Sequence, residues 1–328
     1  MNVLILGAGA LGSVYGGYLA RAGHAVTLVS RAAHVQGIQA HGLRVSGPEA
    51  FVVPVRAVTT ARDLSQTDLL ILCVRSNDTA AALASVAHLR PEMAISFQNG
   101  LQKEGALIRQ FGPGPVVGAV SLVGARTLAP GHVQCTLFGH TWFGELDGSA
   151  SPRVQGLRRV WQRAGLPVDI PADIRAVQWS KLAYLLPLST LGGLTRLAYH
   201  DVLRSPDLAY LFLQMLREVN KIAHEQGIEL QDYPGITART LATGPFAACV
   251  ELLAGLGESL HASGQTEIAT NMLADLQKGR PTEIEALAGD LVRFAQDAGL
   301  SLPAISFVYR AIRGIDACRA APSDPPPP

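Results

Sequence analysis

Three glycines, one lysine and one glutamate are the residues of this 328-residue chain whose surroundings point most directly to chemistry. The stretch ILGAGALG places Gly7, Gly9 and Gly12 at the spacing GxGxxG, directly after a short apolar run. Lys181 stands within the apolar stretch DIRAVQWSKLAYLLPL, and Glu283 stands within GRPTEIEAL. A glycine loop of this spacing can bind the pyrophosphate of a dinucleotide, and a lysine or a carboxylate can move or hold a proton.

The glycine loop is expected to bind a dinucleotide, because it follows a strand pattern and opens a helical pattern. The first glycine allows the tight turn, the second lets the backbone approach the pyrophosphate, and the third lets the helix pack on the strand. A turn with only a structural role is the alternative interpretation. The loop residues expected at the cofactor are Gly7, Ala8, Gly9, Ala10, Leu11 and Gly12.

The second expected strand, AVTLVSR, indicates which dinucleotide binds. A free 2′-hydroxyl on the adenine ribose calls for Asp or Glu about 20 residues past the glycines. This strand ends instead with Ser30 and Arg31. A guanidinium at this place can bind a 2′-phosphate, which favours NADP(H) over NAD(H). The alternative is that Arg31 is an ordinary solvated surface arginine.

Two further expected strands end with polar side chains. Arg75 and Asn77 follow LLILCV, and Gln98 and Asn99 follow AISF. Ligands of doubly wound sheets bind outside the carboxyl ends of the strands, so these residues are candidates for the same site. For Asn99, a turn residue before Gly100 is the alternative interpretation.

Lys181 and Glu283 also have interpretations that need no function. A lysine within an apolar helix either extends its amine to water or has a partner. Thr282 and Glu285 have the spacing of a capping box, which would leave Glu283 in the first helical turn as a complement to the helix dipole.

The elements that position these residues form two regions. The first alternates strands with helical stretches, as a doubly wound parallel sheet of an α/β domain does. Beyond about residue 175, helical periodicity dominates, which predicts an all-helical domain. The expected strands are Val3–Leu6, Ala25–Val29, Leu69–Val74, Ala94–Phe97 and Val116–Val120. The expected helices are Ala10–Ala22, Val177–Leu186, Leu208–Gln226, Pro245–Ala262 and Thr282–Ala298.

Composition narrows the function classes. The net charge of +1 predicts neither a nucleic-acid partner nor an anionic membrane partner. No apolar window is long enough to span a membrane, so a cytoplasmic location is expected. The four cysteines lie far apart without metal-ligand spacing, so no metal site is expected. The Pro-rich end of the chain, residues 317–328, is expected to be disordered.

Four segments together resemble the ketopantoate reductase (2-dehydropantoate 2-reductase) family: ILGAGALGSVYGGYLARAGHAVTLVSR, QNG, WSKLA and NMLADLQKGRPTEIEALAGDL. The resemblance implies a Rossmann domain over residues 1–172. It also implies a helical substrate domain of the 6-phosphogluconate dehydrogenase type over residues 173–316. The family's enzymes use NADPH in pantothenate biosynthesis, with the active site between the domains. A homodimer is also expected, from the apolar stretches of the helical region.

The resemblance implies roles for single residues. Lys181 matches the family's general acid, and Glu283 matches an acidic residue near lysine, substrate and cofactor. Asn99 matches an amide that orients the lysine and the nicotinamide. The implied reaction is hydride transfer from NADPH to a ketone carbon, while Lys181 protonates the developing alkoxide. Positions matching cofactor contacts include Ser30, Arg31, Arg75 and Ala125, and Arg75 stands where the family usually has lysine.

The substrate positions depart from the family pattern. Asparagines that bind substrate in well-known members are replaced by Leu185 and Ser189, and a serine that binds the carboxylate aligns with Asn271. The first hypothesis is therefore NADPH-dependent reduction of a 2-oxo acid, ketopantoate to pantoate. One alternative is a bulkier or more apolar 2-oxo acid, ketone or imine, reduced by the same mechanism. The other is an NADP(H) sensor without turnover.

Overall fold

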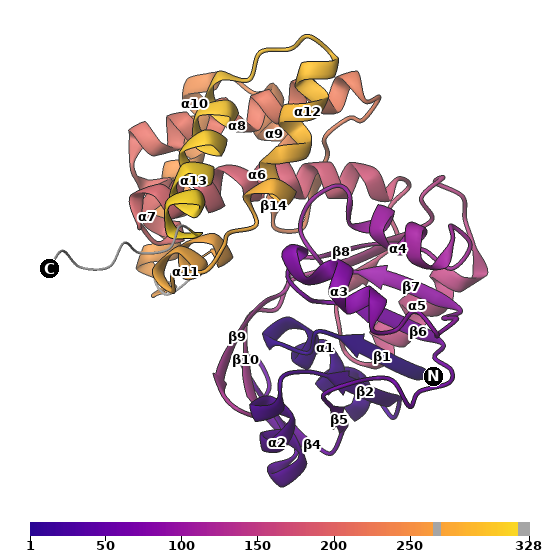
Figure 1. Ribbon diagram of the computed structural model, residues 1–328. Helices are drawn as coiled ribbons and strands as arrows, with labels where there is room; N and C mark the ends of the chain where they lie inside the picture. The colour runs from indigo at the N-terminus through magenta and orange to yellow at the C-terminus, as the bar shows by residue number, and fades with distance from the viewer. Residues whose placement is uncertain (265–269, 321–328) are drawn as a thin grey trace, which may run out of the picture. The chain divides into compact units, whose positions relative to one another are not determined.

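The computed structural model describes residues 1–264 and 270–320, which form two compact units. The first unit ends at Val177 and the second begins at Gln178. Figure 1 shows the strands gathered in the first unit and helices making up nearly all of the second. This is the expected order of an α/β region followed by a helical region.

The centre of the first unit is a parallel sheet of five strands in the order β5-β2-β1-β6-β7. This is the sheet of a Rossmann-type domain, as expected from the sequence. Its strands are β1 (Asn2–Leu6), β2 (Ala25–Val29), β5 (Arg56–Val58), β6 (Leu69–Leu72) and β7 (Met93–Ser96).

The central strands β1 and β6 are buried on both faces of the sheet, because they are apolar at successive positions. Ile5 faces one core, which includes α1 (Ala10–Arg21) and α5 (Pro152–Arg163). Leu4 faces the other core, to which α3 (Thr79–Ala84) and α4 (Lys103–Phe111) contribute Leu83 and Leu107. The crossover helices therefore cover both faces and leave the strand ends for a ligand.

The expected strand Val116–Val120 does not belong to the parallel sheet. The chain pairs with β7 through one isolated parallel bridge, from Val116 to Ala94. It then forms β8 (Gly118–Ser121), which pairs antiparallel with β11 (Thr141–Gly144). The cause is this pairing with a strand more than twenty residues later, which no local pattern reveals.

Smaller elements complete the first unit. A four-stranded sheet has the order β4-β3-β10-β9, and β12 (Val168–Asp169) adds to β11. The strands of the four-stranded sheet are β3 (Leu43–Ser46), β4 (Phe51–Val53), β9 (Gly124–Ala129) and β10 (His132–Leu137). The remaining helices are α2 (Ala32–His41) and the 3₁₀ turn η1 (Ser76–Asp78).

The second unit is built around α6 (Ile174–Thr195), which begins within the first unit and runs on without a break. Pro187 lies inside this helix. The other elements are α7 (Tyr199–Arg204), α8 (Pro206–Glu225), the hairpin β13 (Asp232–Tyr233) and β14 (Ile236–Thr237), α9 (Ala238–Thr243), α10 (Phe246–Ala262), α11 (Asn271–Gln277), the π-helical turn η2 (Glu285–Gly289), α12 (Asp290–Asp297) and α13 (Pro303–Ala320).

The first residues of the predicted disordered tail are helical. Residues 317–320 of the predicted tail belong to α13, whose last turn is held by a hydrogen bond from Arg319 Nη1 to the Leu276 carbonyl at 2.7 Å. Buried Ile305, Val308 and Ile312 give this helix an apolar stripe. Residues 321–328 of the predicted tail lie outside the described residues.

Candidate functional site

The three glycines of the loop between β1 and α1 differ in what surrounds them. Gly7 has φ +93°, and an added Cβ there would lie 2.5 Å from Val74 Cγ1. A Cβ on Gly12 would lie 2.9 Å from both the Gly7 carbonyl oxygen and Ile5. A Cβ on Gly9 meets nothing within 4 Å. The turn and the packing therefore require the outer two glycines, while Gly9 faces open space, as close approach of a ligand requires.

The N-terminus of α1 faces the same loop. Gly9 caps this 12-residue helix without a side-chain hydrogen bond, and its first turn contains no acidic residue. The first N–H groups of a helix have no partner within the helix, and they carry the positive end of its dipole. Ala10, Leu11 and Gly12 therefore offer backbone donors suited to the phosphates of a dinucleotide.

Ser30 and Arg31 follow β2 beside this loop. The Ser30 hydroxyl donates to the Ala8 carbonyl at 2.8 Å, so Ser30 stabilises the conformation of the glycine loop. Arg31 is exposed and occupies the N-cap position of α2, whose first turn has no acidic residue. A guanidinium at the positive end of a helix is unfavourably placed, and an anion bound there would relieve the repulsion.

A buried histidine that no sequence motif marks, His34, is connected to the loop through hydrogen bonds. Gly131 N–H donates to His34 Nδ1 at 3.1 Å, so the ring is neutral and carries its proton on Nε2. Nε2 donates to Ser13 Oγ at 3.0 Å, and Ser13 Oγ donates to the Ala8 carbonyl at 3.2 Å. The chain of hydrogen bonds joins α2, α1 and the loop. Burial lowers the pKa of His34 below its ordinary value.

The lowered pKa of His34 predicts a pH dependence of stability. Below about pH 6.5 the unfolded chain binds a proton at this ring that the folded chain does not bind. This contribution to stability is present above pH 6.5 and is lost as the pH falls towards the folded pKa. We expect His34→Gln to flatten the fall of Tm between about pH 7 and pH 5. Thermal unfolding across that range checks this, with exposed His41→Gln of the same helix as control; equal slopes in the wild type and His34→Gln would contradict it.

The loops after β6 and β7 carry the other candidates of the first unit. Arg75 and Asn77 follow β6, and Arg75 is the N-cap of η1. Asn99 follows β7. Because β6 and β7 are parallel neighbours, both loops lie at the edge of the sheet where the glycine loop lies. Ala125 lies on β9, which packs against α1.

Lys181 and Leu185 form the open part of α6. All residues of the stretch 176–193 are buried except these two, which are partly exposed. They stand one turn apart, so they lie on the same face of the helix. Pro187 does not end the helix, and it leaves this relationship intact. Ser189, the third substrate candidate on α6, is 3% exposed.

The rotation of α6 about its axis is fixed by the two residues that precede Lys181. Ser180 Oγ accepts a hydrogen bond from Gln231 N–H at 2.9 Å. The Trp179 ring stacks on Phe294 of α12, with the ring centroids 6.2 Å apart. The two residues directly before Lys181 therefore anchor its helix.

Glu283 lies in a buried segment that the structure organises differently from the expected capping box. Thr282 donates through its N–H and its hydroxyl to Asp316 of α13, the hydroxyl at 2.6 Å. The Glu285 carboxylate instead accepts from Tyr309 at 2.9 Å and forms an ion pair with Arg313 at 3.1 Å. The capping-box prediction is therefore wrong, because α13 supplies the partners. The helix predicted from Thr282 begins only at the π turn η2.

The last substrate candidate, Asn271, is the exposed first residue of α11. This helix packs on the end of α6, since a Cβ on Gly193 would lie 3.2 Å from Met272. In the second unit the structure thus brings Asn271 close to the end of the helix that carries Lys181, Leu185 and Ser189.

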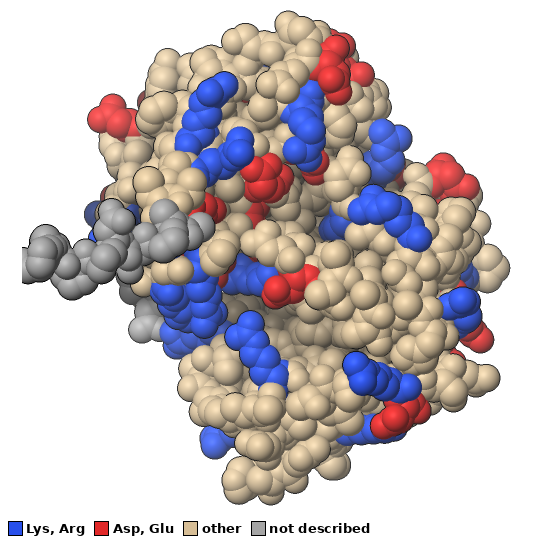
Figure 2. Space-filling model, viewed as in Figure 1, with Lys and Arg blue, Asp and Glu red and all other residues tan. Residues whose placement is uncertain are grey.

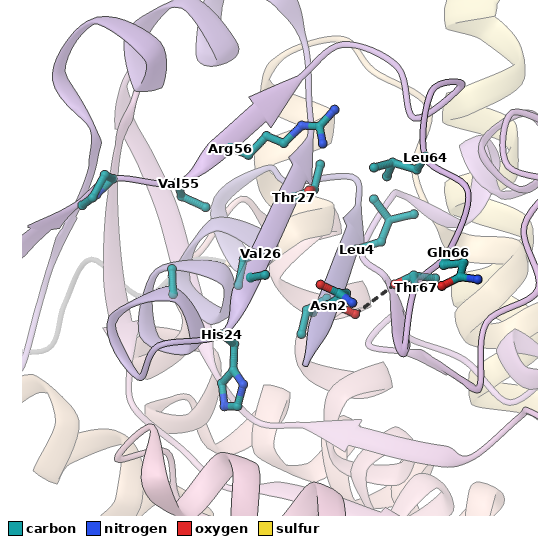
Figure 3. Close-up of a pocket in the computed structure, with 14 residues that line it drawn as sticks. Asn2, Leu4, His24, Val26, Thr27, Val55, Arg56, Leu64, Gln66 and Thr67 are labelled. Carbon is teal, nitrogen blue, oxygen red and sulfur yellow. Dashed lines mark hydrogen bonds between the residues drawn. The ribbon is translucent and has the colours of Figure 1, made fainter.

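A hollow of about 400 Å³ lies elsewhere, at the amino ends of β1 and β2 (Figure 3). Asn2, His24 and Thr67 border it, and Thr67 donates to the Asn2 carbonyl at 3.1 Å. The glycine loop lies at the carboxyl ends of the same strands, so this hollow is not the predicted cofactor site.

Three expectations concern the whole described part of the chain: its surface charge, metal-ligand clusters and long apolar helices. Acidic and basic side chains are interspersed over the face in Figure 2. Among residues 1–264 and 270–320, no cluster of three or more His, Cys, Asp or Glu can hold a metal ion. Within the same ranges no helix is sufficiently long and apolar to cross a bilayer.

Comparison with known proteins covers both units. The family model "Ketopantoate reductase PanE/ApbA" matches residues 3–148, and its C-terminal counterpart matches residues 173–316. The 2-dehydropantoate 2-reductase of Pyrococcus abyssi is 28% identical over 318 residues, covering 97% of this chain and 98% of the relative. That of Mesorhizobium japonicum is also 28% identical, over 95% of this chain and 97% of its own.

Solved structures agree with this relationship. A PanE/ApbA family ketopantoate reductase from Ralstonia eutropha JMP134 superposes with a TM-score of 0.82 at 27% identity, over 98% of this chain and 100% of its own. A D-mandelate dehydrogenase with NADH and anilino(oxo)acetate has a TM-score of 0.82 at 20% identity, over the same shares, and shows a common fold. Reductases of the matched family use a nicotinamide cofactor. The chain therefore belongs to the ketopantoate reductase family, whose members are oxidoreductases acting on a keto/hydroxyl pair.

Proposed function

We propose that this protein is an NADPH-dependent reductase that converts ketopantoate (2-dehydropantoate) to pantoate, with Lys181 as the general acid. The observation that carries the proposal is the open face of α6, where Lys181 and Leu185 are the two partly exposed residues of the otherwise buried stretch 176–193. A lysine on the open face of an otherwise buried helix is a stronger candidate for a functional role than a surface lysine whose alkyl chain covers apolar side chains. The curated relatives named as 2-dehydropantoate 2-reductases support the substrate.

The first unit offers the residues that would hold the cofactor. The backbone of the glycine loop and the start of α1 would bind the pyrophosphate, since Gly9 is open and the first turn is uncapped. Arg31 would bind the 2′-phosphate. Arg75, Asn99 and Ala125 are assigned to the same cofactor by family resemblance. NADPH supplies the hydride when it is bound.

The protein's own part in the reaction is to bind, align and protonate the ketone. Lys181 Nζ would donate its proton to the carbonyl oxygen as negative charge develops there. Glu283, which is 7% exposed, would keep the lysine charged and aligned. Asn99 would orient the lysine and the nicotinamide end of the cofactor.

A second candidate substrate class follows from Leu185. This leucine offers an apolar surface where family members offer an amide, so a bulkier or more apolar 2-oxo acid, ketone or imine would gain about 1.5 to 3 kcal/mol from burial against it. Ser189 is buried and Asn271 lies at the start of another helix. We assign Leu185, Ser189 and Asn271 to the substrate side of the site.

Oxidation of NADPH, followed at 340 nm with ketopantoate and a panel of alkyl and aryl 2-oxo acids, tests the proposal. Turnover of ketopantoate supports the first substrate, and a clear preference for an apolar 2-oxo acid supports the second. NADP(H) binding without turnover of any of them would indicate a sensor, which would need neither Lys181 nor Glu283. A cytoplasmic location, a homodimer and a domain boundary at residues 172/173 stay predictions.

Leu185→Asn is expected to shift substrate choice towards ketopantoate. The side chain in the wild type leaves the hydroxyl of ketopantoate without a partner, whereas an asparagine amide can bind it for about 0.5 to 1.5 kcal/mol. The ratio of kcat/KM for an alkyl 2-oxo acid over ketopantoate should therefore fall roughly two- to tenfold. Steady-state kinetics with both substrates measures this ratio. Leu252→Asn, at an exposed leucine of α10, is the control, and a ratio unchanged in Leu185→Asn would show that Leu185 only packs.

A further inference from the structure

The side chain of Gln98 is buried between the two loops that carry Arg75 and Asn99. It is 8% exposed, and both of its amide hydrogens are used. Nε2 donates to the Val74 carbonyl at 2.9 Å and to Thr79 Oγ1 at 2.7 Å. Oε1 accepts from Ser96 Oγ at 3.1 Å. A carbonyl can only accept, so the nitrogen of the amide must face Val74, and the orientation of the amide is determined.

These hydrogen bonds connect segments that the sequence places far apart. Val74 directly precedes Arg75 in the loop after β6, and Thr79 begins α3. Gln98 itself directly precedes Asn99 in the loop after β7. One amide therefore sets the spacing between a residue assigned to the cofactor phosphates and a residue assigned to the nicotinamide.

The glycine loop abuts the same point. A Cβ on Gly7 would lie 2.6 Å from the Val74 backbone nitrogen, so the two backbones are as close as a glycine permits. A shift of Val74 would therefore also be felt by the loop expected to bind the pyrophosphate. Gln98 holds the same residue through the hydrogen bond to the Val74 carbonyl oxygen.

The strand end that carries Gln98 is itself anchored. Lys103 is 8% exposed, and its Nζ donates to the Ser96 carbonyl at 2.9 Å and to Glu104 Oε1 at 2.7 Å. The Ser96 hydroxyl also accepts from Gln98 N–H at 3.2 Å. Ser96 is therefore hydrogen-bonded to both Lys103 and Gln98. This network fixes the end of β7, from which the Gln98 amide extends to the neighbouring loop.

We propose that Gln98 is a positioning residue for the cofactor site, which holds the loops after β6 and β7 at the separation that a whole dinucleotide spans. The proposal rests on the proposed binding of NADPH. A ligand that reaches only one of the loops depends on Gln98 less than a ligand that reaches both. Gln98 acts through Val74 and Thr79 and has no role in the chemical step.

Comparing NADPH with its fragment 2′,5′-ADP tests this inference. Gln98→Met keeps the volume of the side chain and removes its hydrogen bonds. We expect it to weaken NADPH binding about tenfold and 2′,5′-ADP binding about threefold or less, since the fragment lacks the nicotinamide end. Calorimetric titration of both ligands gives the two affinities. A general loss of structure would weaken both equally, and that result, or wild-type affinity for NADPH, would overturn the proposal.

Three further variants complete the test. Gln102→Met makes the same change at an exposed glutamine of the same segment, and wild-type affinities are expected. Thr79→Val removes one partner of the amide and should reproduce part of the effect, whereas Thr79→Ser keeps the hydroxyl and should restore the affinity. If Gln98→Met does not fold, the Thr79 pair decides alone, and equal NADPH affinities in the two would overturn the proposal. A wild type that binds neither ligand would instead contradict the proposed cofactor.

Discussion

Lys181→Ala lowers kcat by about 10² to 10⁴ and leaves the affinity for NADPH nearly unchanged. This is the result we expect if the amine of Lys181 protonates the carbonyl oxygen during hydride transfer. The side chain lies on the open face of α6, whose backbone is anchored through Ser180 and Trp179, so its loss should leave the fold intact. Single-turnover reduction at saturating NADPH, with the cofactor Kd measured by fluorescence, separates the chemical step from binding.

Two variants give this experiment its controls. Lys181→Arg keeps the positive charge, but a guanidinium holds its proton far more tightly than an amine and is a poor proton donor, so its kcat should stay low. Lys221→Ala removes an exposed lysine of α8 and should be neutral. Near-normal turnover by Lys181→Ala would mean that the lysine stem only covers apolar surface and that another group donates the proton.

Arg31→Asp is expected to weaken NADPH binding by about 10- to 100-fold and to leave NADH binding equal or stronger. Hydrogen bonds to charged groups contribute about 1.5 to 3 kcal/mol each, and the aspartate would in addition repel a 2′-phosphate. Arg31 is exposed at the N-terminus of α2, beside Ser30 and the glycine loop, where a carboxylate can accept from a ribose hydroxyl instead.

Titration of both cofactors against the wild type and Arg31→Asp measures this preference. NADH belongs in the test because a D-mandelate dehydrogenase of the same fold is solved with NADH. Arg159→Asp, at an exposed arginine of α5, makes the same change of charge and should leave the preference unchanged. Equal affinity of the wild type for NADPH and NADH would refute the assignment of Arg31 to the 2′-phosphate.

The sequence by itself determined those features that depend on neighbours in the chain. The GxGxxG loop could be recognised because Gly7 must adopt a positive φ and Gly12 must sit against a backbone, and both requirements act within six residues. Short, mainly apolar runs predicted β1, β2 and β6; β1 and β6 are buried on both faces, whereas β2 is buried at Val26 and Leu28 only. The family signature around WSKLA and KGRPTEIEALAG likewise lies in single continuous stretches.

Only the tertiary structure decided the features that join distant residues. β8 pairs with β11 in an antiparallel sheet instead of joining the parallel sheet. Thr282 donates its hydroxyl hydrogen bond to Asp316 instead of forming the predicted capping box. Periodicity records which residues are apolar and not which segments meet, so neither outcome could be read from a local pattern.

The candidate site divides in the same way. Lys181 was visible in the sequence as a cation among apolar residues, but its pairing with Leu185 on the open face of α6 required knowledge of what buries every other position. Gln98 looked like one more polar residue after a strand, and His34 was one of nine scattered histidines. Their hydrogen bonds to Val74, Thr79 and Gly131 cross sequence separations of 19 to 97 residues. Such bonds form only when packing brings the partners together. The sequence could therefore indicate the residues expected to bind ligands, but not the hydrogen bonds that hold those residues in position.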